Sequence, residues 1–174
     1  NPDGHPYPKN IEGSDYLASI HNQITGDAPR LVLDEEVAVQ HAMQALIRTG
    51  CIEHAHDVSD GGLAVCLAES ALHGNVGMNV RLDGAPPARA DAILFGEAQS
   101  RIVFSVAPEN ENRVQACLSK ETGATATPIG TVQGDHLHIS WDESTWVHAS
   151  LADLRHAYED TLPAYMGVEQ RAAA

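Results

Sequence analysis

The sequence predicts an α+β fold in which a mixed, mostly antiparallel sheet is layered against helices. Hydrophobic residues make up 43% of the 174 residues, which is enough to bury a core. Apolar spacing and turn residues give the order helix, strand, helix, strand, strand, helix, hairpin and helix. Because strands and helices do not alternate regularly, a purely parallel sheet is not expected.

The first helices are inferred from capping residues and apolar spacing. A short helix is expected at residues 16–21, and Asp34 is expected to cap a longer helix that ends at Gly50. The apolar stripe of the longer helix comprises Val39, Ala42, Met43, Leu46 and Ile47. A third helix, at residues 63–73, is apolar nearly all round and is therefore expected to be central.

Short apolar or alternating runs predict the strands. They lie at residues 55–58, 76–82, 92–95 and 102–106. Residues 125–132 and 136–140 are expected to pair as a hairpin around a Gln-Gly-Asp turn.

Two further helices complete the predicted fold. Pro108 suits the first turn of a helix that runs to about residue 120. Its inward side chains would be Val114, Cys117 and Leu118. Ser150, three residues before Asp153, is expected to open the last helix.

We expect one domain flanked by extensions. Residues 1–30 are interpreted as a linker and N-terminal extension, 31–145 as the α/β domain, and 146–174 as a C-terminal helix and tail. The chain starts without methionine in a stretch rich in proline and glycine, residues 1–8. We therefore expect a piece of a longer polypeptide.

The charge balance limits the possible partners. There are 24 acidic and 10 basic residues, a formal net charge of −14. Nucleic acid and anionic membranes are therefore not expected as partners, because both are bound largely through lysine and arginine. No apolar run is long enough to cross a bilayer, and no signal peptide is visible. The three well-separated cysteines are typical of buried thiols in a reducing compartment, which indicates the cytoplasm.

The most informative stretch is residues 56–69, where a polar run with two glycines leads into the central apolar helix. A strand would end near Asp57, and the chain would turn through Gly61–Gly62. Such a turn presents unpaired helix N–H groups, and with Asp57 and Asp60 it suits a phosphate, bound directly or through a divalent cation. An equally weighted alternative is that Ser59 or Asp60 only caps the helix.

A second polar turn begins at Gly96. Glu97, Gln99 and Arg101 alternate after it and are expected to form a polar rim on extended backbone. The alternative is a solvated strand edge. Because both turns are expected to follow short strands, and ligands gather at strand ends in layered folds, the two turns together indicate a binding site.

Other sites are disfavoured. His54, His56 and Asp57 could bind a transition metal, but no further histidine or cysteine stands at ligand spacing. A calcium loop from Asp57 fails because Ala68 stands where a bidentate glutamate is required. The glycine patterns of P-loops, dinucleotide folds and serine hydrolases are absent.

Two segments carry a family resemblance. Residues 55–64 and 94–101 closely resemble the two signatures of the aminoimidazole-ribonucleotide-synthetase C-terminal domain. With Gly-Ser-Asp-Tyr-Leu at residues 13–17, they look most like the last domain of the phosphoribosylformylglycinamidine synthase family. The resemblance covers residues 11–145 and implies the fold of that C-terminal domain.

The resemblance implies a ligase of purine biosynthesis that uses ATP and Mg²⁺. Such an enzyme converts formylglycinamide ribonucleotide to its amidine: ATP phosphorylates the amide oxygen, and ammonia from a glutaminase subunit or domain displaces the phosphate. The catalytic residues of the family lie upstream, so none is expected in this chain. We therefore expect the fragment to be inactive without the remaining domains of the full-length synthetase.

The same resemblance assigns site residues. Asp57 corresponds to the metal-side aspartate of the family, and Glu97 opens the triplet that corresponds to its substrate-binding residues. Both carboxylates are expected to bind the metal. The expected phosphate- or nucleotide-binding residues are Ser59, Asp60, Gly61, Gly62, Gly96 and Gln99. Ala98 departs from the family by replacing a hydroxyl side chain. Two alternatives remain: a non-catalytic structural or partner-docking module, and the C-terminal domain of another member such as aminoimidazole ribonucleotide synthetase.

Overall fold

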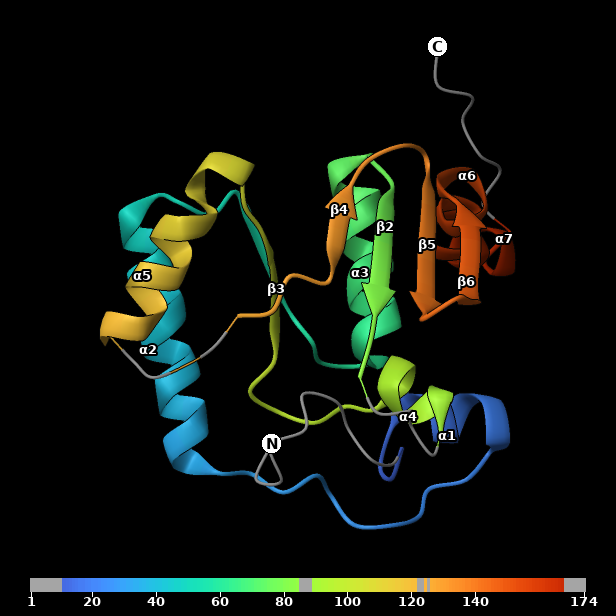
Figure 1. The fold of residues 1–174 in the computed structure, drawn as a ribbon. Helices are drawn as coiled ribbons and strands as arrows, with labels where there is room; N and C mark the ends of the chain where they lie inside the picture. The colour runs from blue at the N-terminus through green and yellow to red at the C-terminus, as the bar shows by residue number, and fades with distance from the viewer. Residues whose placement is uncertain (1–10, 85–88, 122–123, 125, 168–174) are drawn as a thin grey trace. The chain divides into compact units, whose positions relative to one another are not determined.

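The computed structural model describes residues 11–84, 89–121, 124 and 126–167 (Figure 1). The opening stretch at residues 1–8 lies outside the described residues. The chain divides into two compact units, Asn1–Leu67 with Ala85–Pro128, and Ala68–Gly84 with Ile129–Ala174. The boundaries 1–30, 31–145 and 146–174 stay a prediction.

The first unit joins helices to a two-stranded sheet. Its elements are α1 (Asp15–His21), α2 (Leu33–Thr49), β1 (His54–Asp57), the first part of α3 (Gly62–Gly74), α4 (Ala90–Phe95), β3 (Ile102–Ser105), η1 (Pro108–Asn110) and α5 (Glu111–Glu121). β1 and β3 are antiparallel, with His54 opposite Ser105 and Asp57 opposite Ile102.

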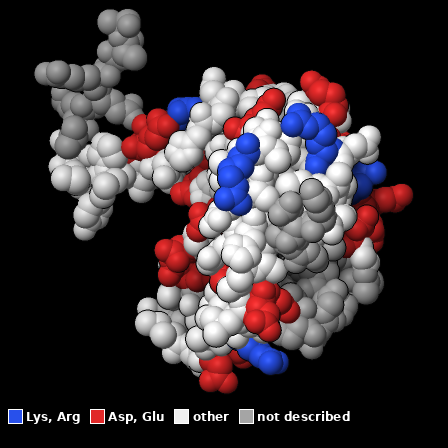
Figure 2. Space-filling view, turned by 90° about the vertical axis from the view of Figure 1, so that its left-hand side faces the viewer, with Lys and Arg blue, Asp and Glu red and all other residues white. Residues whose placement is uncertain are grey.

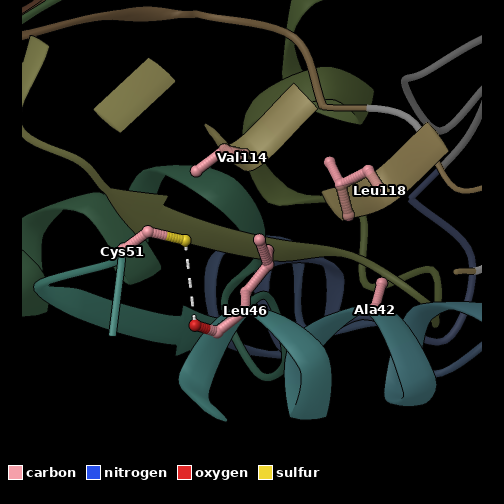
Figure 3. Packing of buried hydrophobic residues seen from close by; sticks show 5 residues of the cluster. All are labelled: Ala42, Leu46, Cys51, Val114 and Leu118. Atoms are coloured by element: carbon pink, nitrogen blue, oxygen red, sulfur yellow. Dashed lines mark hydrogen bonds between the residues drawn. The ribbon is translucent and has the colours of Figure 1, made fainter. Parts of the chain in front are cut away.

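The core between α2 and α5 explains why these helices form a pair. Val114 and Leu118 of α5 point toward Leu46 and Ala42 of α2, and Cys51 closes the same cluster (Figure 3). Leu46 is fully buried. The spacings Ala42–Leu46 and Val114–Leu118 are four residues each, so each pair lies on one face of its helix.

The second unit is built on a four-stranded mixed sheet. Its strands are β2 (Met78–Leu82), β4 (Gly130–Val132), β5 (His136–Trp141) and β6 (Ser144–Ser150), in the order β4-β2-β5-β6. The β2–β5 pair is parallel and the other two pairs are antiparallel. The chain continues into α6 (Leu151–Arg155), the π-helical turn η2 (His156–Asp160) and α7 (Thr161–Tyr165). The predicted α+β fold with a mixed, mostly antiparallel sheet is confirmed.

The predicted hairpin was wrong. β4 pairs with β2, and β5 pairs with β2 from the other side. Gly77 brings β2 to the turn, because its N–H donates to Gly134 O and its O accepts from Gln133 N, both at 2.8 Å. A turn signal in the sequence shows that the chain reverses there, but it does not show which strand lies beside each arm.

Three local predictions also need correction. Residues 92–95 were expected to form a strand but belong to helix α4. The prediction failed because a short apolar run has no periodicity that separates a strand from a buried helix. Asp34 lies in the first turn of α2, while Val32 is the N-cap and makes no side-chain cap hydrogen bond. Ile47 is 62% exposed, although it was placed in the inward stripe.

Other sequence predictions are confirmed. Buried side chains occur along the whole of α3, and Val114 and Leu118 of α5 are buried. Ser150 caps α6, since its Oγ accepts from the N–H of Asp153 at 3.0 Å. All three cysteines are free thiols; Cys51 and Cys66 are buried as expected, whereas Cys117 is only half-buried. Among the described residues, no helix is both long and apolar enough to cross a membrane. Carboxylate side chains are spread over the face shown in Figure 2.

Candidate functional site

Three separate segments meet at the carboxylate of Glu97. Its Oε1 accepts a hydrogen bond from the backbone N–H of Asp15 and another from that of Gly61, both at 2.8 Å. These segments are the same three that carry the family resemblance. We call this meeting point the Glu97 junction; it comprises residues 14–17, 59–62 and 94–97.

The glycine turn of the junction depends on both of its glycines. Gly61 and Gly62 have φ of +76° and +69°, a region that side chains strongly disfavour. A Cβ on Gly62 would lie 2.7 Å from the carbonyl carbon of Phe95 and 2.8 Å from the oxygen of Leu94. Only a residue without a side chain lets the turn approach the end of α4 so closely.

Helix α1 is fixed to the junction at its first turn. The Oγ of Ser14 accepts from the N–H of Leu17 at 3.3 Å and donates to the oxygen of Ile11 at 2.6 Å. The ring of Tyr16 stacks on that of Phe95, with centroids 4.4 Å apart and planes 3° from parallel. Ser14 and Glu97 therefore cap two of the N–H groups at the start of α1 that the helix itself leaves unpaired.

Arg101 closes the second turn on itself. Its guanidinium donates to the carbonyl oxygens of Gly96 and Ala98. Burial removes water from this cation and lowers its pKa to about 10. The predicted polar rim on extended backbone was wrong, because Ser100 takes a left-handed φ of +62° and Arg101 bonds back to the turn.

Ser100 links this turn to α2. Its Oγ donates to Oε2 of Glu36 at 2.6 Å, and Gln40 donates to Oε1 of the same carboxylate at 2.8 Å. Hydrogen bonds from Ser100 and then from Gln40 hold the pKa of Glu36 below its ordinary value. A serine in this turn thus orients one end of α2.

The turn predicted to receive a phosphate is contacted in the structure by the protein's own Glu97 carboxylate. The N–H of Gly61 donates to Glu97, and the N–H of Gly62 donates to Ser59 O at 3.0 Å. The N–H of Gly96 donates to Ala92 O at 3.0 Å. The three glycines therefore shape the turns, while their amides are already engaged.

The side chains of the other predicted site residues take no part in the hydrogen bonds described above. Ser59, Asp60 and Gln99 are exposed, and the side chain of Asp57 is 73% exposed. The ring of His56 lies beside Asp57, with Nδ1 3.8 Å from Oδ1. Within residues 11–84, 89–121, 124 and 126–167, no three histidine, cysteine or acidic side chains are grouped to hold a metal ion.

Sequence reasoning missed several contributors to the junction. Asp15 takes part through its backbone and Tyr16 through its ring, and Glu36 supports the second turn through Ser100. The tyrosine lay within the resemblance at residues 13–17, but its partner Phe95 could not be identified from spacing. No local pattern signals a contact between positions 82 residues apart, the separation of Asp15 and Glu97.

Comparison with known proteins identifies the family of this chain. The family model described as AIR synthase related protein, C-terminal domain, matches residues 6–142. The subunit PurL of phosphoribosylformylglycinamidine synthase from Salinibacter ruber is 49% identical over 158 residues, which are 90% of this chain and 21% of that protein. Its counterpart in Moorella thermoacetica is 41% identical over 163 residues, 94% of this chain and 22% of that protein.

Solved structures agree on the fold. Phosphoribosylformylglycinamidine synthase II from Thermotoga maritima has a TM-score of 0.61 at 21% identity, covering 85% of this chain and 25% of that chain. The T. maritima PurL complexed with ATP also has a TM-score of 0.61, at 20% identity, covering 85% and 24%. The chain spans about a fifth of the length of the curated relatives it matches.

Proposed function

Because the chain belongs to the family of AIR synthase related proteins, C-terminal domain, we propose that it forms the last domain of a phosphoribosylformylglycinamidine synthase. The 49% identity to the S. ruber subunit over 90% of the chain carries this proposal. The whole protein would be a cytoplasmic ligase of purine biosynthesis. It would convert formylglycinamide ribonucleotide, ATP and glutamine-derived ammonia to formylglycinamidine ribonucleotide, with a glutaminase subunit or domain supplying the ammonia.

In this reaction ATP activates the amide oxygen as a phosphate ester, and ammonia then displaces the phosphate. The chemistry depends on positioning and on stabilising charge at the transferred phosphoryl group. We assign no catalytic residue to this chain. Its contribution would be to hold part of a nucleotide or phosphate site and to support the domains that carry out the chemistry.

The carboxylates fit Mg²⁺ in chemical type, since this ion prefers oxygen ligands. Asp57 is accessible to an ion, and Glu97 has its Oε1 engaged by two amides, which leaves Oε2 as the atom for a metal. Further ligands would come from phosphate oxygens, water or the rest of the longer protein. When bound, the ion would neutralise charge on phosphoryl oxygens.

The predicted phosphate-binding residues divide into two roles under this proposal. The Ser59 hydroxyl and the Gln99 amide are exposed groups that can reach a phosphate or nucleotide, and Asp60 stands beside them in the chain. Gly61, Gly62 and Gly96 would instead set the backbone path, because their N–H groups already have protein acceptors.

The test uses the full-length protein with Asp57→Asn, and with Asp83→Asn as a control at another exposed carboxylate. Titration calorimetry with ATP and Mg²⁺ is expected to show binding weakened by about tenfold for Asp57→Asn, as for loss of one charged ligand, and unchanged for Asp83→Asn. Equal binding by all three proteins would remove Asp57 from the site.

A second candidate is a non-catalytic structural or partner-docking module. The observation in its favour is that the Glu97 carboxylate and the Gly61 amide already bind each other. Full turnover by Asp57→Asn, together with loss of the glutaminase partner on removal of the domain, would favour this second candidate.

A further inference from the structure

The connection between α1 and α2 exposes an unusual amount of apolar surface. The apolar side chains in and beside it are Ile20, Ile24, Leu31, Leu33 and Val37, which are 66%, 92%, 50%, 68% and 48% exposed. Single exposed apolar residues are ordinary, but five within eighteen positions indicate a surface that contacts something. We call residues 20–37 the α1–α2 segment (Figure 1).

Between α1 and α2 the backbone makes few hydrogen bonds to the described residues of its own unit. The N–H of Gly13 donates to Thr25 O at 3.3 Å, and the N–H of Gln23 donates to Leu17 O at 3.2 Å. Among the residues that the structure describes, no backbone hydrogen bond involves Gly26–Leu31. A connection with few hydrogen bonds and exposed apolar side chains gains little stability from its own unit.

The charges around the segment indicate what kind of surface would cover it. Between residues 11 and 37 there are six carboxylates, and Arg30 is the one arginine or lysine. A symmetric dimer would bring this acidic surface against its own copy, so like charges would oppose association. A complementary surface would have an apolar centre and a rim of lysine and arginine.

We propose that the α1–α2 segment docks onto such a surface, carried by another part of the longer synthase. This inference rests on the proposed function, under which about four-fifths of the polypeptide lies outside the chain described here. Ile24 and Leu33 would be the apolar anchors, one near each end of the connection. Asp27 and Asp34 would face the basic rim.

Trypsin cleavage after Arg30 in the full-length protein tests this proposal. In the wild type, docking should protect this bond, and cleavage should be much slower than in the urea-unfolded protein. The double variant Ile24→Asp, Leu33→Asp should be cleaved on the order of tenfold faster or more, because docking would have to bury two charged side chains in place of two apolar ones. Folding should be unaffected, because both side chains are exposed in the unit itself.

Leu162→Asp is the matched control, because Leu162 is 64% exposed and lies in the other unit. Its cleavage after Arg30 should equal that of the wild type. Raising the salt concentration should speed cleavage of the wild type, because salt screens the attraction between the basic rim and Asp27 and Asp34. The Arg30 bond is a readout of docking that does not depend on turnover.

Three outcomes would overturn the inference. The wild-type bond could be cleaved as fast as in the unfolded protein, the double variant could be as protected as the wild type, or protection could rise with protein concentration, which would indicate a second copy. Absent amidine synthesis with intact protection would instead count against the proposed function alone.

Discussion

The Oε1 atom of Glu97 lies 2.8 Å from the backbone nitrogen of Gly61, although 36 positions separate the two residues. A glycine turn at the start of a helix attracts an anion, and here a side chain of the same unit supplies it. Since this carboxylate also caps α1 through Asp15, one residue ties together the three segments that carry the family resemblance.

Glu97→Ala should lower the free energy of unfolding by about 1–2 kcal/mol, because two N–H groups lose a charged acceptor in a partly exposed place. Glu97→Gln should lower it less, since its side-chain oxygen can still accept. Urea denaturation measures both, and Glu143→Ala, at an exposed position, is the control. Hydrogen exchange should quicken at the amides of Asp15 and Gly61 in the alanine variant, and unchanged exchange there would contradict the contact.

Gly62→Ala should be more damaging than Gly50→Ala. Both glycines have left-handed φ, at +69° and +63°, but a Cβ on Gly50 meets nothing within 4 Å. We expect about 1 kcal/mol for the backbone strain at Gly50 and at least about 3 kcal/mol at Gly62, where the new atom meets the backbone of Phe95. Similar losses in thermal or urea unfolding would show that the approach of the turn to α4 is not tight.

Leu46→Ala should lower the free energy of unfolding by about 2–5 kcal/mol, because it leaves a cavity between α2 and α5. Ile47→Ala is the neighbouring control, since that side chain is 62% exposed and its loss should change stability by about 0.5 kcal/mol or less. Denaturation of both variants measures the difference. Equal effects would place Leu46 outside the core.

Ser100→Gly should raise the pKa of Glu36 toward its ordinary value of 4.5, because the main hydrogen bond to the carboxylate is lost. Glycine suits the left-handed backbone at this position, so strain does not confuse the result. Gln40→Ala should give a smaller rise. NMR titration of the Glu36 side chain measures the pKa of each variant.

The lowered pKa of Glu36 also makes the stability of the folded protein depend on pH. The folded protein holds the Glu36 proton less tightly than the unfolded chain, so this group stabilises the fold above the ordinary pKa of 4.5. That contribution is lost as the pH falls through the lower pKa of the folded state. Ser100→Gly should therefore lose less stability than the wild type on acidification, and an equal loss would contradict the assignment.

Sequence patterns predicted the structure correctly where the interactions that determine it are local. The mostly apolar helix α3 has buried side chains along its length, and Ser150 caps α6 within three residues of itself. The two glycines marked a turn that no other residue could form as easily. These features depend on backbone preference and on the spacing of apolar residues along one element.

Only the tertiary structure determined which segments of the chain pair and pack with one another. The apolar run at residues 92–95 is compatible with a buried strand or a buried helix, and in the folded chain it forms a helix with Ala92, Ile93 and Leu94 buried. Strand β4 pairs with β2 rather than with β5, its neighbour in sequence. Likewise, the sequence placed an anion at the Gly61–Gly62 turn, but only the folded chain brought the carboxylate of Glu97 there. Contacts across tens of residues depend on which surfaces pack together, and no short stretch of sequence encodes that choice.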